Sequence, residues 1–249
     1  MSAPSDLPPP FGADWALFLD VDGTLLDHAE RPDAVRPGAT EVHLLEALGL
    51  ACGGALALIS GRAVADLDAM FAPLALPAAG QHGIERRDAA GAVYRHALPS
   101  QALRRAAARI GEFAARHRGL VFEDKGDNLA LHFRMAPQLA GAVEAALGEA
   151  AATLGAGFEL LRGKMVVELK PSGRDKGSAI GEFMREAPFA GRRAVFVGDD
   201  QTDEYGFGVV NRLGGHSVKV GAGASTARYR LADAAAVRAW LARWAARDA

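Results

Sequence analysis

The chain has 249 residues, of which 50% are hydrophobic and 23% are charged, a mixture that can bury a sizeable core and argues against general disorder. Its 28 basic and 30 acidic residues give a net charge of −2, which lacks the basic excess typical of a nucleic-acid binder. The single cysteine, Cys52, excludes an intrachain disulfide and a zinc cluster made of cysteines.

The sequence has no segment typical of export or of membrane insertion. No uncharged apolar stretch approaches the roughly 20 residues of a membrane span. The N-terminal segment 1–13 is rich in proline and lacks both the basic and the apolar region of a secretory signal. We therefore expect a cytoplasmic protein that binds neither membranes nor nucleic acid.

Short apolar runs that end in polar or glycine residues occur near both ends of the chain. Such continuous runs are typical of strands buried on both faces, as in a parallel sheet covered by helices. Apolar residues at helical spacing predict helices over 37–49 and 175–187. The pattern predicts a doubly wound, Rossmann-like α/β core, in which ligands bind at the carboxyl ends of the strands. The four runs are residues 15–27, 55–62, 193–204 and 216–223.

The middle of the chain has a different pattern, typical of half-exposed strands and amphipathic helices. After a predicted hairpin around Ala90 and Gly91, the elements follow the order α-β-β-α-β-β, which indicates an antiparallel sheet with helices on one face. The elements are a helix over 100–119 with Ser100 as its N-cap, two strands joined at 126–128, a helix over 137–154 that begins near Pro137, and a strand pair around Gly163.

Two domains follow from these patterns. We expect a core made of residues 1–83 and 172–249, and an inserted α+β cap over residues 84–171. The C-terminal segment 231–249 is predicted to form one helix.

Two aspartates follow the first predicted strand. Asp20 and Asp22 are two residues apart, so their side chains point to the same side of an extended backbone. Adjacent carboxylates repel each other unless a cation lies between them or one is protonated. The backbone amides of the following turn predict an anion-binding nest. A carboxylate next to a hard cation and phosphate-binding amides suggests attack on phosphorus to give an aspartyl-phosphate. The candidate phosphate-binding residues are Asp20, Val21, Asp22, Gly23 and Thr24.

That pair has a simpler explanation of about equal weight, which is a strand-end turn rich in aspartate and glycine. A second acidic cluster adds to the case for a bound cation, because Asp199, Asp200 and Asp203 follow another predicted strand. Oxygen ligands of this kind suit Mg²⁺. Capping of the next helix by Asp203 or Thr202 is the alternative, and it does not explain Asp199.

Two further residues stand where a phosphoryl group would need them. Ser60 and Arg62 follow the second strand and offer a hydroxyl, an amide and a guanidinium, although Ser60 is also a good N-cap. Lys176 stands at a predicted helix start, where its ammonium would neutralise Asp20 and the transferring group. Only five of the 28 basic residues are lysines, so a solvated surface position is a weaker explanation for Lys176.

Together, DVDGT, Ser60, Lys176 and GDDQTD resemble the haloacid dehalogenase-like phosphohydrolases, in this order along the chain. The resemblance implies that Asp20 is the nucleophile and that Asp22 is the general acid and then the base. It implies a Mg²⁺ site formed by Asp20, Asp199 and the main chain of Asp22, with Asp203 as a partner of these ligands.

The segments GQHGIE, FEDKG, LHFR and GKMVVELKP resemble the trehalose-6-phosphate phosphatase family over nearly the whole chain. The resemblance implies that Glu123, Lys125 and Glu168 bind sugar hydroxyls. It also implies that His82, between Gly80 and Gly83, contacts substrate near the cap boundary, with Arg62 as a contact from the core. Without the resemblance, ion pairs on an exposed sheet face explain the three cap residues better. His132 fits a structural strand position, and Arg134, Lys164 and Lys170 stay unassigned.

The expected activity is Mg²⁺-dependent hydrolysis of trehalose 6-phosphate. The alternatives are a phosphatase for another glycosyl phosphate, such as sucrose phosphate or mannosyl-phosphoglycerate, a phosphosugar mutase, and a catalytically silent phosphosugar sensor. A sensor has no need of a nucleophile, so the set of Asp20, Asp22, Lys176 and Asp199 argues against it.

Overall fold

The computed structural model describes residues 7–12, 14–28, 35–96, 101–163 and 165–245. The chain divides into two compact units, a core unit of Met1–Tyr94 with Asp175–Ala249 and a cap unit of Arg95–Arg174. The expected N-cap at Ser100 and part of the proline-rich N-terminal segment lie outside the described residues.

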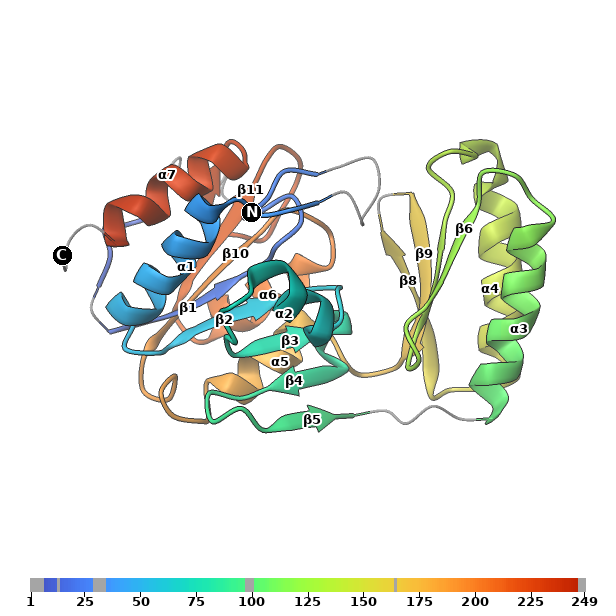
Figure 1. Ribbon diagram of the computed structural model, residues 1–249, viewed down its shortest axis with the longest axis horizontal. Helices are drawn as coiled ribbons and strands as arrows, with labels where there is room; N and C mark the ends of the chain where they lie inside the picture. The colour runs from blue at the N-terminus through green and yellow to red at the C-terminus, as the bar shows by residue number, and fades with distance from the viewer. Residues whose placement is uncertain (1–6, 13, 29–34, 97–100, 164, 246–249) are drawn as a thin grey trace. The chain divides into compact units, whose positions relative to one another are not determined.

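The core unit is built on an eight-stranded sheet with the order β12-β11-β10-β1-β2-β3-β4-β5 (Figure 1). The first six strands in this order run parallel to one another, and β4 runs antiparallel to β3. Every residue of β1 is buried, as the continuous apolar run predicted. The strands are β1 (Trp15–Leu19), β2 (Leu56–Ile59), β3 (Ala78–Gly80), β4 (Glu85–Arg87), β5 (Val93–Arg95), β10 (Arg193–Gly198), β11 (His216–Val220) and β12 (Tyr229–Leu231).

Helices cover both faces of this sheet, which confirms the predicted α/β core. Helices α1 (Ala39–Ala51) and α7 (Ala234–Ala245) pack together on one face, and α5 (Lys176–Phe183) and α6 (Asp203–Arg212) pack together on the other. Helix α2 (Val64–Phe71) contacts β3 and β4. Among the described residues, no helix has both the length and the apolar character needed to cross a membrane.

The cap unit is a four-stranded antiparallel sheet with two helices packed on one face. The strand order is β6-β7-β9-β8, and the buried side chains of both helices pack on residues such as Leu129, Leu131 and Leu169. This arrangement confirms the predicted separate antiparallel sheet. The elements are α3 (Gln101–Ala115), β6 (Val121–Asp124), β7 (Leu129–His132), the 3₁₀ turn η3 (Pro137–Leu139), α4 (Ala140–Leu154), β8 (Phe158–Gly163) and β9 (Val166–Pro171).

The hairpin around Ala90 and Gly91 belongs to the core sheet, although the sequence pattern places it in the cap. Its strands β4 and β5 extend the eight-stranded sheet beyond β3, and Asp88 closes the turn by a hydrogen bond from its amide to the carbonyl of Ala92. The cap unit therefore begins at Arg95 and ends at Arg174, compared with the expected 84–171. Short, half-polar strands give no local signal of which sheet they join.

Candidate active site

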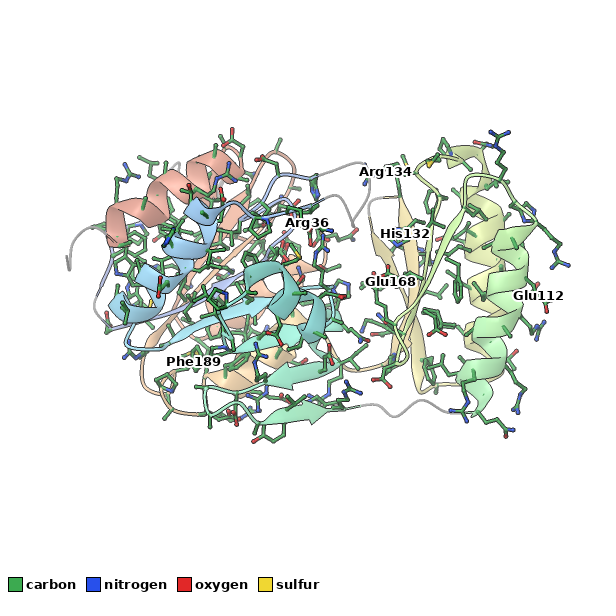
Figure 2. The ribbon with its side chains drawn as sticks, viewed as in Figure 1. Arg36, Glu112, His132, Arg134, Glu168 and Phe189 are labelled. Atoms are coloured by element: carbon green, nitrogen blue, oxygen red, sulfur yellow. The ribbon has the colours of Figure 1, made fainter. Side chains whose placement is uncertain are left out.

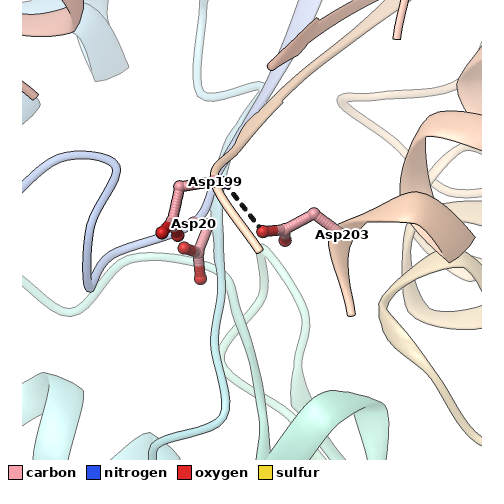
Figure 3. Close-up of side chains that lie close together, drawn as sticks. All are labelled: Asp20, Asp199 and Asp203. Atoms are coloured by element: carbon pink, nitrogen blue, oxygen red, sulfur yellow. Dashed lines mark hydrogen bonds between the residues drawn. The ribbon is translucent and has the colours of Figure 1, made fainter. Parts of the chain in front are cut away.

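Three buried or half-buried carboxylates meet at the carboxyl ends of β1 and β10. These strands are parallel neighbours, with Leu19 opposite Val197, so the residues that follow them lie at the same edge of the sheet. Asp20, Asp199 and Asp203 each offer an oxygen, and these oxygens all lie within 4.8 Å of one another (Figure 3). This is the clustering that the two aspartate motifs predicted.

The turn after Asp20 is shaped by Gly23, which has a φ of +84°. A Cβ at this position would lie 2.4 Å from Oδ2 of Asp199, so a side chain would displace a carboxylate of the cluster. The amides of Gly23 and Thr24 donate to carbonyls of the same loop. Of the amides in this loop, those of Val21 and Asp22 make no hydrogen bond with a described residue.

Lys176 lies between two of the carboxylates. Its Nζ donates to Oδ1 of Asp20 at 2.8 Å and to Oδ1 of Asp203 at 2.7 Å, and all three side chains are buried. Helix α5 presents this lysine in its first turn, because Asp175 caps the helix by accepting a hydrogen bond from the amide of Ser178. Burial lowers the pKa of Lys176, but the charges of Asp20 and Asp203 hold it well above the ordinary value. The ammonium therefore stays charged.

Asp203 organises the end of β10. Its Oδ2 accepts hydrogen bonds from the amides of Asp199 and Asp200, both at 2.9 Å, while Oδ1 faces Lys176. Glycine is required at position 198, because a Cβ there would lie 2.3 Å from Cγ of Asp203. Asp203 thus places the backbone that carries Asp199.

The capping role expected for Asp203 or Thr202 falls instead to Asp200. Oδ1 of Asp200 accepts from the amide of Thr202 at 2.8 Å, from its hydroxyl at 2.6 Å and from the amide of Asp203 at 3.2 Å. Burial raises the pKa of Asp200, but the charge of Lys176 and these hydrogen bonds hold it well below the usual range. Asp200 is therefore an ionised structural residue, which sequence reasoning left without a role.

Asp20 carries more negative charge around it than Lys176 neutralises. Burial raises the pKa of Asp20 to about 7, the charge of Lys176 opposes this rise, and the charges of Asp199 and Asp200 add to it. Even with the ammonium groups of Lys176 and Lys219, the four carboxylates leave an excess of negative charge. A hard cation held by oxygen ligands would remove that excess, so the donor set fits such an ion.

Asp22 points to Arg62 and lies outside the metal-capable group of Asp20, Asp199 and Asp203. Nε and Nη2 of Arg62 donate to the two oxygens of Asp22 at 2.7 and 2.6 Å, a bidentate pair that is partly buried. Arg62 was expected to contact substrate, and its partner in this structure is the expected acid–base residue.

Ser60 is buried where β2 ends, beside β1. Its Oγ accepts a hydrogen bond from the amide of Arg62 at 3.1 Å, and α2 begins only after Ala63, so Ser60 does not cap that helix. His82 lies next to Ser60, since its amide donates to the Ser60 carbonyl at 3.0 Å. Gln81 and His82 both have positive φ values, 49° and 57°, which are strained for residues with side chains.

Two further residues near the carboxylates belong to none of the motifs found in the sequence. Lys219, at the end of β11, is buried and donates to the carbonyls of Asp199 and Val220. His28 lies within 2.9 Å of Oδ2 of Asp199 through its Nε2. Lys219 agrees with the expectation that the few lysines stand where an ammonium is needed, whereas nothing in the local sequence of His28 marks it.

The three expected sugar-contact residues of the cap lie together. Ala130 on β7 lies between Glu123 on β6 and Glu168 on β9, because it pairs with both. Nζ of Lys125 is 3.8 Å from Glu123 and 3.6 Å from Glu168. Burial raises the pKa of Glu123, but a hydrogen bond from His132 and the charge of Lys125 lower it below the ordinary value. Glu123 is thus suited to accept hydrogen bonds from hydroxyl groups.

Comparisons with known proteins agree with this geometry. The sequence profile of a family described as trehalose-phosphatase matches residues 18–235. A trehalose-6-phosphate phosphatase from Escherichia coli (strain K12) is 45% identical over 241 residues, which cover 97% of this chain and 90% of the relative. A probable trehalose-phosphate phosphatase from Sinorhizobium fredii is 44% identical over 207 residues, covering 83% of this chain and 78% of the relative.

Comparison with a solved structure supports the fold. The C-terminal domain of the Candida albicans trehalose-6-phosphate phosphatase superposes with a TM-score of 0.81 at 20% identity, covering 94% of this chain and 92% of that one. At this identity the likeness concerns the fold, and it includes both the parallel sheet and the inserted antiparallel unit.

Proposed function

The chain belongs to the trehalose-phosphatase family, and from that premise we propose that it hydrolyses trehalose 6-phosphate to trehalose and phosphate, with the phosphoryl group carried transiently on Asp20. The observation that carries the proposal is the contact of Asp20 with Lys176 at 2.8 Å inside the buried carboxylate cluster. A nucleophilic carboxylate, a fixed ammonium and a metal-capable pair of carboxylates are the parts that phosphoryl transfer needs.

Asp20 attacks phosphorus in line with the sugar oxygen, and the bond between phosphorus and that oxygen breaks. Asp22 gives its proton to the leaving sugar oxygen, which releases trehalose. Asp22 then takes a proton from water, whose oxygen attacks the phosphorus of the aspartyl-phosphate and frees Asp20. Arg62 donates to both oxygens of Asp22, so the first proton transfer requires this pair to open.

Charge on the transferred group is neutralised by fixed groups around Asp20. The ammonium of Lys176 supplies a permanent positive charge, and Ser60 and the amides of Val21 and Asp22 supply hydrogen bonds. Arg62 and His82 contact the substrate from the core in this proposal. The amides of Gly23 and Thr24 shape the loop rather than bind phosphate, because their hydrogen bonds are already made within it.

The metal is Mg²⁺ in this proposal. Asp20 and Asp199 would hold it through their carboxylates, together with the main chain of Asp22, and Asp203 keeps Asp199 and Lys176 in place. When bound, Mg²⁺ supplies positive charge that offsets the negative charge of the cluster and of the phosphoryl oxygens. Uncatalysed hydrolysis of phosphate monoesters needs accelerations of up to about 10²¹-fold, more than positioning alone provides.

Mg²⁺ should raise the melting temperature more at pH 8 than at pH 5.5. Asp20 has a folded-state pKa raised to about 7, so without metal the folded state prefers the protonated acid and loses stability from this group as pH rises from about 4 to 7. Mg²⁺ binds the carboxylate and must displace the proton at low pH. Thermal melts in EDTA and in Mg²⁺ at both pH values measure the difference.

Asp199→Asn is the control for that experiment, since it should remove most of the gain at pH 8. An equal gain at both pH values, or the same gain in Asp199→Asn, would contradict a metal site built on Asp20 and Asp199.

The sugar is bound by Glu123, Lys125 and Glu168 in this proposal. Their carboxylates and ammonium can each engage several hydroxyl groups, and a site left with unpaired buried polar groups discriminates strongly against a wrong sugar. Glu168 and Lys125 support the assignment because their charged groups lie 3.6 Å apart and their side chains are only 9% and 11% exposed. The pair is suited to bind a polar ligand placed against it.

A substrate panel tests the function. Phosphate release should be fast and Mg²⁺-dependent with trehalose 6-phosphate, and much slower with glucose 6-phosphate, sucrose 6-phosphate, mannosyl-phosphoglycerate and p-nitrophenyl phosphate. Glu168→Gln should raise the KM for trehalose 6-phosphate about tenfold or more, because it removes a charged acceptor, and should leave p-nitrophenyl phosphate turnover unchanged.

Each other outcome of the panel points to a different activity. Fast release from another sugar phosphate keeps the chemistry of Asp20 and overturns the assignment of the cap residues. Transfer of phosphate between sugar positions without release of free phosphate indicates a mutase. Binding of trehalose 6-phosphate without turnover indicates a sensor.

A further inference from the structure

The cap sheet has one face covered by α3 and α4 and one face that carries a chain of polar side chains. Leu129, Leu131 and Leu169 pack toward the helices. Side chains alternate along strands, so the residues between them, including His132 and Glu168, lie on the opposite face (Figure 2). This polar chain runs from Asn128 through Glu168, Lys125 and Glu123 to His132.

The contacts within the chain differ in kind. Lys125 lies 3.6 and 3.8 Å from the two glutamates, so its ammonium makes no hydrogen bond with either of them. At the two ends the distances are those of hydrogen bonds, since Nε2 of His132 is 3.1 Å from Oε2 of Glu123, and Nδ2 of Asn128 donates to Oε2 of Glu168 at 3.2 Å. Each carboxylate therefore has a hydrogen bond to its amide or imidazole neighbour that can orient it, and the lysine lies farther away.

Asn128 occupies a position that an apolar residue would fill more favourably. It is completely buried, and its Oδ1 makes no hydrogen bond with any described residue. Burying an unmatched amide oxygen costs free energy that leucine, of similar size, would not cost. Among the described residues, the one hydrogen-bond partner of its side chain is Glu168. Asn128 thus positions Glu168, although its burial lowers the stability of the cap.

His132 is the matching residue at the other end. It stands opposite Val121 on β6 and Val166 on β9, so its apolar neighbours leave Glu123 as the hydrogen-bonding partner across the strand. Its side chain is 25% exposed, compared with 40% for Glu123. An imidazole ring is stiff, with two rotatable bonds, and holds Glu123 with little freedom.

We propose that Asn128 and His132 are positioning residues for sugar recognition, which fix the carboxylates of Glu168 and Glu123 in the orientation that accepts sugar hydroxyls. The inference rests on the proposed function, because it concerns the same cap residues. Neither side chain needs to touch the sugar or the phosphoryl group. Their loss should weaken recognition of the disaccharide and leave the chemistry at Asp20 intact.

Variants at both positions, compared over two substrates, test the proposal. Asn128→Leu and His132→Leu should each raise the KM for trehalose 6-phosphate about tenfold, because a carboxylate loses its fixed donor, with kcat changed less than about twofold. Turnover of p-nitrophenyl phosphate, which has no sugar, should equal that of the wild type. His132→Gln keeps a donor near the position of Nε2 and should restore the KM to within about twofold.

The matched control is Arg162→Gln on β8. Arg162 is exposed and pairs with Glu144 of α4, on the helix side of the sheet, so its loss perturbs the cap without touching the polar face. Arg162→Gln should leave the KM for trehalose 6-phosphate and the turnover of p-nitrophenyl phosphate unchanged. Thermal melts of every variant show whether the cap is folded, and Asn128→Ser replaces Asn128→Leu if the latter does not fold.

The outcomes separate this proposal from the proposed function. If the wild type does not hydrolyse trehalose 6-phosphate, the function itself is wrong. If it does, and Glu168→Gln raises the KM while the leucine variants do not, the positioning roles are overturned. Equal losses on both substrates, or no rescue by His132→Gln, would assign Asn128 and His132 to cap stability alone.

Discussion

Asp20→Asn should lower the turnover of trehalose 6-phosphate by at least about 10⁴-fold, because an amide cannot form the aspartyl-phosphate and the remaining groups only position the substrate. The fold should survive. Asparagine keeps an oxygen that can accept the hydrogen bond from Lys176. It also removes the buried carboxyl group of Asp20, whose pKa is raised by burial. We expect the melting temperature in EDTA to stay within about 4 °C of the wild type or to rise.

Steady-state phosphate release and mass spectrometry of acid-quenched enzyme measure both aspects. The wild type should show a phosphorylated peptide that contains Asp20, and the variant should not. Asp66→Asn is the matched control, since Asp66 is an exposed aspartate on α2. Retained turnover in Asp20→Asn, or phosphorylation at another residue, would overturn the nucleophilic role.

Asp22→Asn should separate the two proton transfers. With trehalose 6-phosphate, turnover should fall by about 10² to 10⁴-fold, because the sugar oxygen is a poor leaving group that needs a proton. With p-nitrophenyl phosphate, the leaving group needs no proton, so Asp20 should still be phosphorylated. Hydrolysis of that intermediate lacks its base, and one equivalent of nitrophenolate should appear in a burst before a slow steady state.

Rapid-mixing absorbance measurements detect the burst, and Arg62→Lys serves as the companion variant. Lysine keeps one charge near Asp22 but cannot make the bidentate pair seen at 2.7 and 2.6 Å. It should lower turnover of the sugar phosphate more than that of p-nitrophenyl phosphate if Arg62 holds Asp22. A rise in KM alone, for both substrates, would show that Arg62 contacts the substrate without holding Asp22, and a missing burst in Asp22→Asn would contradict the acid–base role.

The architecture of the core and the set of groups at its edge could be predicted from the sequence. Strands buried on both faces must be apolar throughout, so β1 and β10 appear in the sequence as uninterrupted runs. Polar residues directly after such runs lie at one edge of a parallel sheet wherever the strands are neighbours. For that reason Asp20 and Asp199 were expected together, and the structure places them so.

The boundary of the cap and the partners of the side chains were decided only by the tertiary structure. The short strands β4 and β5 have no apolar run of their own, and they belong to the core sheet because β4 pairs with β3 and β5 pairs with β4. The pairing of Arg62 with Asp22, and of Lys219 with the backbone of Asp199, joins residues 40 and 20 positions apart in the chain.

The same holds for Asn128 and His132 in the cap. Which side chain meets Glu168 or Glu123 depends on the register of three strands and on side-chain rotamers. Local sequence patterns report burial and periodicity, because these follow from the hydrophobic effect acting on each segment. Hydrogen-bond partners across strands follow from where folding brings distant segments, so the sequence by itself determined which groups the site contains, and only the tertiary structure determined which group each of them holds.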